Sequence, residues 1–436
     1  MINKWPFKSL TVAKFLANMF SSIVVLYSDN EMGQRTRLGV KYSADIVHSF
    51  IDALRNRRTR LRYLDITGLP IAEIIIKYVA THCRLAQKEY QRNCLIDEYL
   101  QNVHDLENLC ERPNTYIRND LKKTTSLPDE QLVFKFDCIL QERATYDELI
   151  GALDAANSMN SRFLLQIAKL DLVCLGKSNI IKLLDRIDKR SVEGLRLQYN
   201  SITEESIKDI LPHVSQLTNL CALDLSCNLI DYRQNPESSR QMAVALGQLA
   251  QLNRLDLSGS PLGGCLASLL SCVQKPLQYL SLHSCGLTDT DLIYLSMSKH
   301  NQAEHLDLSE NRLNRYSDAL IILLKCCAPF LFVLELDDNR FDCIDYLTII
   351  CLARKMPKLK VLATKGTFET NDHLLAGEFL NYSNNLLAWR ISYPIDIYDP
   401  NEHDVVAQES QKRAFLDRLN SIIKDKFKIV VNELFL

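Results

Sequence analysis

The chain has 436 residues, of which 47% are hydrophobic and 24% are charged, and its formal net charge is −2. This composition is that of a globular protein rather than a disordered one. The nearly balanced charge argues against a general nucleic-acid binder, because such a protein needs a basic surface to displace the counterions of the phosphates.

Residues 1–70 are predicted to form an N-terminal cap that includes a first repeat-like unit. Lysines precede an apolar run at residues 15–27, as in a secretory signal, but the run is too short to span a bilayer and lacks a small-x-small cleavage site. We therefore expect no cleaved signal. Residues 44–58 have the spacing of an amphipathic helix, and LRYLDITGL at residues 61–69 has a repeat-like strand pattern. A helix that leads into a strand suits the end of a solenoid.

Residues 71–130 are predicted to be a helical insert followed by a loop, because residues 116–130 show no hydrophobic period. Residues 131–140 alternate between apolar side chains and their neighbours, which predicts a strand, and residues 144–156 have helical spacing. These elements open a repeat array that we expect to cover residues 131–392.

Eight segments share the pattern leucine, any residue, leucine, two further residues, then Asn or Cys, although the last two copies are degenerate. The first leucine-like position of this core, the marker residue, is Leu195, Leu223, Leu255, Leu280, Leu306, Leu334, Leu362 or Trp389. A period of about 28 residues predicts an α/β leucine-rich-repeat solenoid, a horseshoe of ribonuclease-inhibitor-like repeats with strands inside and helices outside. Residues 393–436, with an amphipathic stretch at 404–427, are expected to cap its C-terminal end.

Within a repeat, alternate residues of the strand point to opposite sides. Leu223 and Leu225 should therefore face the core, while Asp224 faces outward. Asn228, like Asn311 in a later repeat, stands where the chain leaves the strand, and its amide is expected to satisfy backbone groups that the turn leaves free.

The outward positions of the array carry mainly negative charge. The acidic residues, here called the acidic stripe, are Asp224, Asp256, Asp307, Glu335 and Asp337. Basic or titratable residues beside them are Arg196, Arg254, His283 and His305. A strand ladder would stack these side chains on the concave face, which suggests a docking surface for a basic partner segment because aligned charges add. The alternative is that LDLS is common filler in such repeats.

Neither a catalytic, a metal nor a cofactor site is indicated. The motifs GxxxxGK[ST], GxSxG and HExxH are absent from the sequence. The fourteen cysteines are scattered without a CxxC pair, so we expect free thiols in a reducing compartment and no zinc. His283 and His305 are out of step by roughly 13 Å along their strands and should not share a metal. We therefore expect a non-enzymatic protein.

Several segments, in order, resemble the PRAME family: WPFKSL at residues 5–10, LRYLDI at 61–66, ATYDELIGAL at 144–153, PLQYLSLHSCGLTDTDLIYLS at 276–296 and YPIDIYDP at 393–400. The resemblance implies a horseshoe that recognises a protein. It also implies candidate roles: substrate receptor of a cullin-2 ubiquitin ligase reached through elongins B and C, nuclear co-regulator of transcription, or regulator of NF-kappa-B signalling.

The ligase role depends on a segment that family members carry before the WPF motif. Here residues 1–4 precede it, and an elongin-box pattern that begins at Ser9 and Leu10 has Lys14 where Cys or Ala is required. Elongin B/C and cullin-2 are therefore expected as partners only if a further N-terminal segment exists, and residues 1–436 alone are expected not to bind elongins.

We predict an interaction scaffold that is cytoplasmic, with nuclear localisation also open because of the basic run at residues 57–62. A solvated helix end is the simpler interpretation of that run. The alternative function is an enzyme inhibitor of the ribonuclease-inhibitor type, for which Tyr279 and Tyr199 would serve as aromatic anchors.

Overall fold

The computed structural model describes residues 63–65, 76, 79, 132–140, 143–157, 163–366, 368–383, 385–394, 405–424 and 426–432. The helix predicted at residues 44–58 and almost all of the insert predicted at 71–130 lie outside the described residues. The strand pattern at residues 61–69 contains β1 (Tyr63–Asp65).

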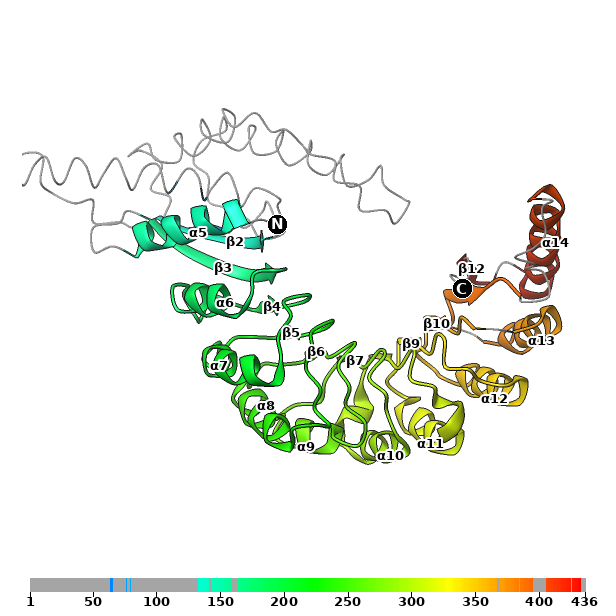
Figure 1. The fold of residues 1–436 in the computed structure, drawn as a ribbon. Helices are drawn as coiled ribbons and strands as arrows, with labels where there is room; N and C mark the ends of the chain where they lie inside the picture. Colours follow the sequence, from blue (N-terminus) through cyan, green and yellow to red (C-terminus); the bar gives the residue numbers. More distant parts are fainter. Residues whose placement is uncertain are drawn as a thin grey trace, which may run out of the picture.

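The described strands form one parallel sheet in which each strand pairs with the next in sequence. After β1 the strands are β2 (Leu132–Leu140), β3 (Phe163–Leu172), β4 (Gly194–Arg196), β5 (Ala222–Asp224), β6 (Arg254–Asp256), β7 (Tyr279–Ser281), β8 (His305–Asp307), β9 (Val333–Glu335), β10 (Val361–Ala363), β11 (Ala388–Ser392) and β12 (Lys428–Asn432). Parallel neighbours need a crossover after every strand, and the crossover segments run along the outside of the arc (Figure 1).

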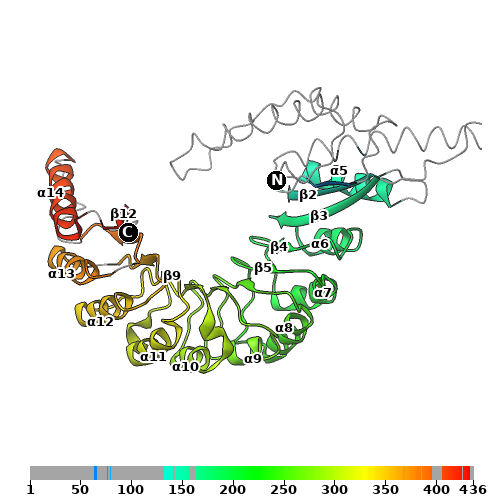
Figure 2. The ribbon, with the colours of Figure 1, turned by 180° about the vertical axis from the view of Figure 1, so that it is seen from behind.

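The helices line the convex side of the arc in both views (Figures 1 and 2). They are α5 (Arg143–Ala156), α6 (Lys177–Leu184), α7 (Glu204–Val214), α8 (Pro236–Gln248), α9 (Leu266–Leu270), α10 (Asp289–Met297), α11 (Ser317–Cys327), α12 (Cys343–Ala353), α13 (Thr370–Leu380) and α14 (Val405–Ile423), with 3₁₀ turns η2 (Lys299–Gln302) and η3 (Leu313–Tyr316). The predicted horseshoe, with strands inside and helices outside, is confirmed.

The predicted marker residues lie opposite one another across the sheet. Leu195 pairs with Leu223, and the register continues unbroken to Trp389. The same register extends beyond the eight marker residues, to Leu170 in β3 and to Ile429 in β12. The alignment of the repeats is therefore confirmed, and the ladder is longer than the motif alone indicates.

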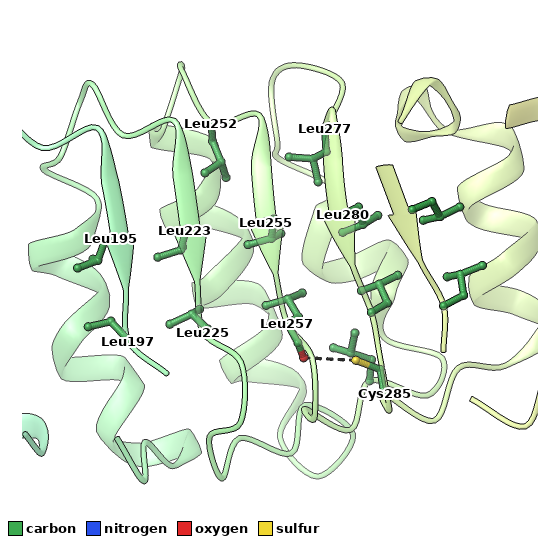
Figure 3. Packing of buried hydrophobic residues seen from close by; sticks show 14 of the residues in the cluster. Leu195, Leu197, Leu223, Leu225, Leu252, Leu255, Leu257, Leu277, Leu280 and Cys285 are labelled. Atoms are coloured by element: carbon green, nitrogen blue, oxygen red, sulfur yellow. Dashed lines mark hydrogen bonds between the residues drawn. The ribbon is translucent and has the colours of Figure 1, made fainter. Parts of the chain in front are cut away.

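Leucines from each strand fill the space between the sheet and the helices (Figure 3). Leu223 and Leu225 are 2% and 1% exposed, and the helix residues Ile207, Leu211 and Val214 are buried against the same core. Each repeat covers its apolar face only with its neighbours, so the core is one continuous strip along the solenoid.

Buried asparagines join successive repeats where the chain leaves each strand. The Asn228 Oδ1 atom accepts hydrogen bonds from the backbone N–H groups of Asn200 and Ile202 in the preceding repeat. Its amide nitrogen donates to carbonyls on both sides, those of Leu197 and Leu225 among them. Asn311 and Asn339 repeat this arrangement with their own neighbours. The predicted role of these amides is confirmed.

Two consecutive repeats lack this amide. Ser260 and Cys285 occupy the position, and the buried Ser260 hydroxyl makes no hydrogen bond with a described residue. The Cys285 thiol donates to the Leu257 carbonyl oxygen at 3.3 Å (Figure 3). A thiol is a weak donor, so this part of the ladder has fewer and weaker links between repeats.

Carboxylates at the helix starts add a second set of links. The buried Asp291 side chain accepts from the backbone N–H of Thr288 at 2.9 Å, as expected for the start of α10. The same carboxylate also accepts from the N–H groups of Gly264 and Leu266 in the preceding repeat. It therefore caps its own helix and holds the neighbouring loop.

The C-terminal segment predicted as a cap contains α14 and also β12. Gly377 allows α14 to pack closely on α13, because a Cβ atom at this position would lie 2.7 Å from the Leu419 side chain. The strand β12 was not anticipated, since residues 428–432 lack the marker pattern. A short run of β-branched residues is too brief to distinguish a strand from a loop by sequence period.

We predict that Leu225→Asp prevents folding to a soluble protein, because an unpaired charge at this buried site costs on the order of several kcal/mol. The matched control is Leu229→Asp, four residues away, where the native side chain is 65% exposed and the change should cost at most about 0.5 kcal/mol. Thermal unfolding of both variants tests the assignment, which a normal melting temperature for Leu225→Asp would contradict.

Asn311→Ala should lower the free energy of unfolding by about 3 kcal/mol, because it leaves the buried N–H groups of Cys285 and Leu287 without an acceptor. Asn314→Ala changes an exposed side chain three residues away, in η3, and should be nearly neutral. Urea unfolding measures both. Equal stabilities would mean that the amide is not a structural link.

Candidate functional site

The concave face presents two parallel rows of side chains. The leading row holds the residues before the marker positions: Lys169, Gly194, Ala222, Arg254, Tyr279, His305, Val333, Val361 and Ala388. The trailing row holds those after the markers: Asp171, Arg196, Asp224, Asp256, Ser281, Asp307, Glu335, Ala363 and Arg390. The ladder fixes the order of charges in each row, because adjacent strands lie about 4.8 Å apart.

At the N-terminal end of the trailing row, two carboxylates share one arginine. Arg196 lies between two carboxylates, with its Nη1 atom 3.1 Å from Asp171 Oδ2 and its Nε atom 2.9 Å from Asp224 Oδ2. Asp224, one member of the predicted acidic stripe, is thus already paired within the protein. Arg196 is itself a member of the trailing row, level with Asp224 on the neighbouring strand.

The C-terminal members of the acidic stripe are also paired. Glu335 lies 3.1 Å from His305 Nε2 and 3.4 Å from Arg390 Nη1, and the hydrogen bond from His305 lowers the pKa of the Glu335 carboxyl. Asp337 lies beyond the end of β9 and is buried, with Lys365 Nζ at 3.0 Å. Backbone hydrogen bonds to the neighbouring repeats continue on both sides of Asp337, from Glu310 N–H to its carbonyl and from Asp338 N–H to Lys365, so its assignment to a partner surface stays a prediction.

His283 likewise follows its strand, β7, and lies 3.5 Å from Glu310. His305 pairs in register with Tyr279, which is four residues before His283. The two histidines are therefore offset along their strands, as predicted. In the part of the chain that the structure describes, no group of three or more His, Cys, Asp or Glu side chains could hold a metal ion.

The centre of the trailing row differs from both ends. Asp256 and Asp307 make no ion pair with any described residue. They are joined instead through two hydroxyls: Ser258 donates to Asp256 at 2.5 Å, Ser281 donates to Asp307 at 3.2 Å, and the two hydroxyl oxygens are 2.8 Å apart. Three oxygen–oxygen contacts share two hydroxyl hydrogens, so the network is one donor short when both carboxylates are ionised.

This environment disfavours the charge on Asp256. Burial raises the pKa of its carboxyl, and the like charges of Asp224 and Asp307 act in the same direction, against the hydrogen bonds from Ser258. Beside it, burial and the carboxylates of Asp256 and Asp307 raise the pKa of Tyr279 to about 12. The Arg254 guanidinium lies over the Tyr279 ring, 4.7 Å from its centre.

The concave face is hollowed between β2 and β7. The hollow has a volume of about 300 Å³. Gly194 and Ala222 occupy the leading row where neighbouring strands carry Lys169 and Arg254, so two adjacent positions lack long side chains. Sequence reasoning followed the charged outward positions and missed this feature, although small residues in the leading row of two successive repeats were its visible signal.

A curved parallel ladder with an open inner sheet and outer helices defines a leucine-rich-repeat solenoid, a fold suited to protein–protein interaction. The PRAME C-terminal domain family matches residues 133–431, and the chain belongs to the PRAME family. The resemblance noted in the sequence is thereby confirmed.

The chain is similar to leucine-rich repeat-containing protein 14 from Xenopus laevis, with 28% identity over 325 residues that cover 72% of this chain and 62% of that protein. The human protein of the same name is 30% identical over 230 residues, covering 51% and 46%. Human PRAME family member 20 is 30% identical over 176 residues, covering 39% and 37%. The chain thus spans only part of these relatives.

Among solved structures, the leucine-rich repeat-containing protein LegL7 from Legionella pneumophila is similar, with a TM-score of 0.42 and 15% identity over 69% of this chain and 90% of that one. Among the described helices, none is long and apolar enough to cross a membrane.

Asp256→Asn should stabilise the protein at neutral pH. Because the folded-state pKa of Asp256 is raised, the folded protein holds this proton more tightly than the unfolded chain, and the ionised carboxylate costs stability above that pKa. The advantage of the variant should shrink as the pH falls toward about 4, the pKa of an unfolded aspartate. Urea unfolding at several pH values measures the difference.

The control for this comparison is Glu378→Gln, which removes one charge from the exposed surface of α13. It should change the free energy of unfolding little at any of these pH values. An Asp256→Asn variant that is less stable than the native protein at pH 7.5 would contradict the description of this site.

Proposed function

We propose that the protein is a non-enzymatic interaction scaffold that captures another protein on its concave face. The observation that carries this proposal is the open inner sheet, because the described helices all lie on its other face (Figures 1 and 2). Such a surface gains its specificity from side chains held at fixed spacing by the ladder.

We further propose that capture serves regulation, as the family resemblance implies. The protein would act as the substrate-recognition subunit of a cullin-2 ubiquitin ligase, reached through elongins B and C, or as a regulator of transcription or NF-kappa-B signalling. Either role places it in the cytoplasm or nucleus. Membership of the PRAME family supports this choice.

The second candidate is an enzyme inhibitor of the ribonuclease-inhibitor type. Tyr279 on the concave face and Tyr199, which is 55% exposed at the rim, favour it because tyrosines are frequent anchors of tight interfaces. In this case one enzyme would be bound tightly at defined stoichiometry, and its activity would be lost in the complex.

Affinity purification with mass spectrometry tests the scaffold. The double variant Ala222→Trp with Val333→Trp fills the leading row of the concave face and should lose the captured proteins. The matched control, Val244→Trp with Ile322→Trp, enlarges exposed side chains on α8 and α11 and should keep them. Loss with the convex pair and retention with the concave pair would contradict the proposal.

The eluate also separates the finer roles. Elongins and cullin-2 recovered with the protein would support the ligase role. A single enzyme recovered in equal amount, and inactive, would favour the inhibitor.

A further inference from the structure

We propose that the hollow between β2 and β7 receives one arginine side chain of the captured protein, with Asp256 as its counter-ion. The inference rests on the proposed function and names the chemistry of the partner. It uses the concave sheet face, which no described segment of the chain covers.

The shape of the hollow suits a long side chain. Its floor is Gly194 and Ala222, and the Lys169 side chain bounds it toward β3, while Arg254 and Tyr279 bound it toward β7. A volume of about 300 Å³ is at the lower end of the range for small-molecule sites, about 300 to 1,000 Å³. It therefore has room for one extended side chain and not for a folded loop.

The lining has one more carboxylate than it has basic side chains, which favours a cation. Four carboxylates and three basic side chains line the hollow: Asp137, Asp171, Asp224, Asp256, Lys169, Arg196 and Arg254. Asp137 pairs with Lys169 at 3.7 Å, and Asp171 and Asp224 share Arg196. Asp256 remains as the carboxylate of the lining that no described cation pairs, and Asp307 adds negative charge on the far side of Ser281.

The hydrogen bonds of Asp256 leave one of its oxygens open. The backbone N–H and the hydroxyl of Ser258 both donate to its Oδ1 atom, and no described group donates to its Oδ2 atom, so an entering donor can bind there. The bound cation also offsets the repulsion between the two carboxylates. An entering positive group thus improves an arrangement that is unfavourable without it.

A guanidinium fits better than an ammonium. Arginine can place its methylene stem on the small residues of the floor while its planar head forms two parallel hydrogen bonds to a carboxylate. It is also more weakly hydrated than lysine, so it loses less on entering a half-buried site.

The experiment uses the full chain immobilised on a resin and peptide libraries with a fixed central arginine, citrulline or lysine between randomised positions. Citrulline keeps the shape of arginine and removes its charge. The arginine library should be retained at least about tenfold better than the citrulline library, because a hydrogen-bonded charge pair is lost. Equal retention of arginine and citrulline, or of arginine and lysine, would overturn the proposal.

Two variants localise the effect. Asp256→Asn should bring the arginine-to-citrulline ratio to about one while circular dichroism and melting show an intact fold. Ala222→Leu should reduce retention of the arginine library by filling the hollow without a change in charge. Glu378→Gln should leave the ratio unchanged. A ratio that survives Asp256→Asn would mean that another carboxylate binds the peptide.

The result is separable from that of the proposed function. If concave tryptophans abolish capture of cellular proteins but the arginine preference is absent, the scaffold stands and the arginine site fails. If concave tryptophans leave capture intact, the proposed function itself fails.

Discussion

The solenoid depends on how the backbone is satisfied where each strand ends. A chain that turns inward beneath a sheet buries N–H and C=O groups, and each one left alone costs about 1–3 kcal/mol. The amides of Asn228, Asn311 and Asn339 supply both acceptors and donors at this point, and each reaches into the preceding repeat. Stacking of the repeats and closure of the turns are therefore one interaction, and the regular ladder follows from it.

The ladder in turn dictates the electrostatics of the concave face. Side chains on neighbouring strands are held too close for several carboxylates in succession to remain ionised at no cost, so bases are interspersed among them. Arg196 serves two aspartates at one end, and Glu335 receives both His305 and Arg390 at the other. The acids at both ends of the trailing row thus have basic partners, whereas Asp256 and Asp307 at its middle make no ion pair with a described residue.

The sequence predicted the periodic part of the fold well, because leucines at fixed spacing report burial directly. The marker residues, the turn asparagines and the helix faces around Leu211 all lie as predicted. The pattern carried less information where the array ends, because β12 has no marker motif. It also could not show which acids are paired, since Arg390 reaches Glu335 from two strands away.

The two repeats at Ser260 and Cys285 divide the ladder of amides into an N-terminal and a C-terminal stretch. In a solenoid each unit is coupled only to its neighbours, so the weakest junction sets where the array comes apart. Under mechanical load, or when a bound protein requires a different curvature, we expect the arc to bend between β5 and β6, because the Asp291 carboxylate still links the following pair of repeats. The two arms would then move as separate bodies, with Asp256 at the hinge.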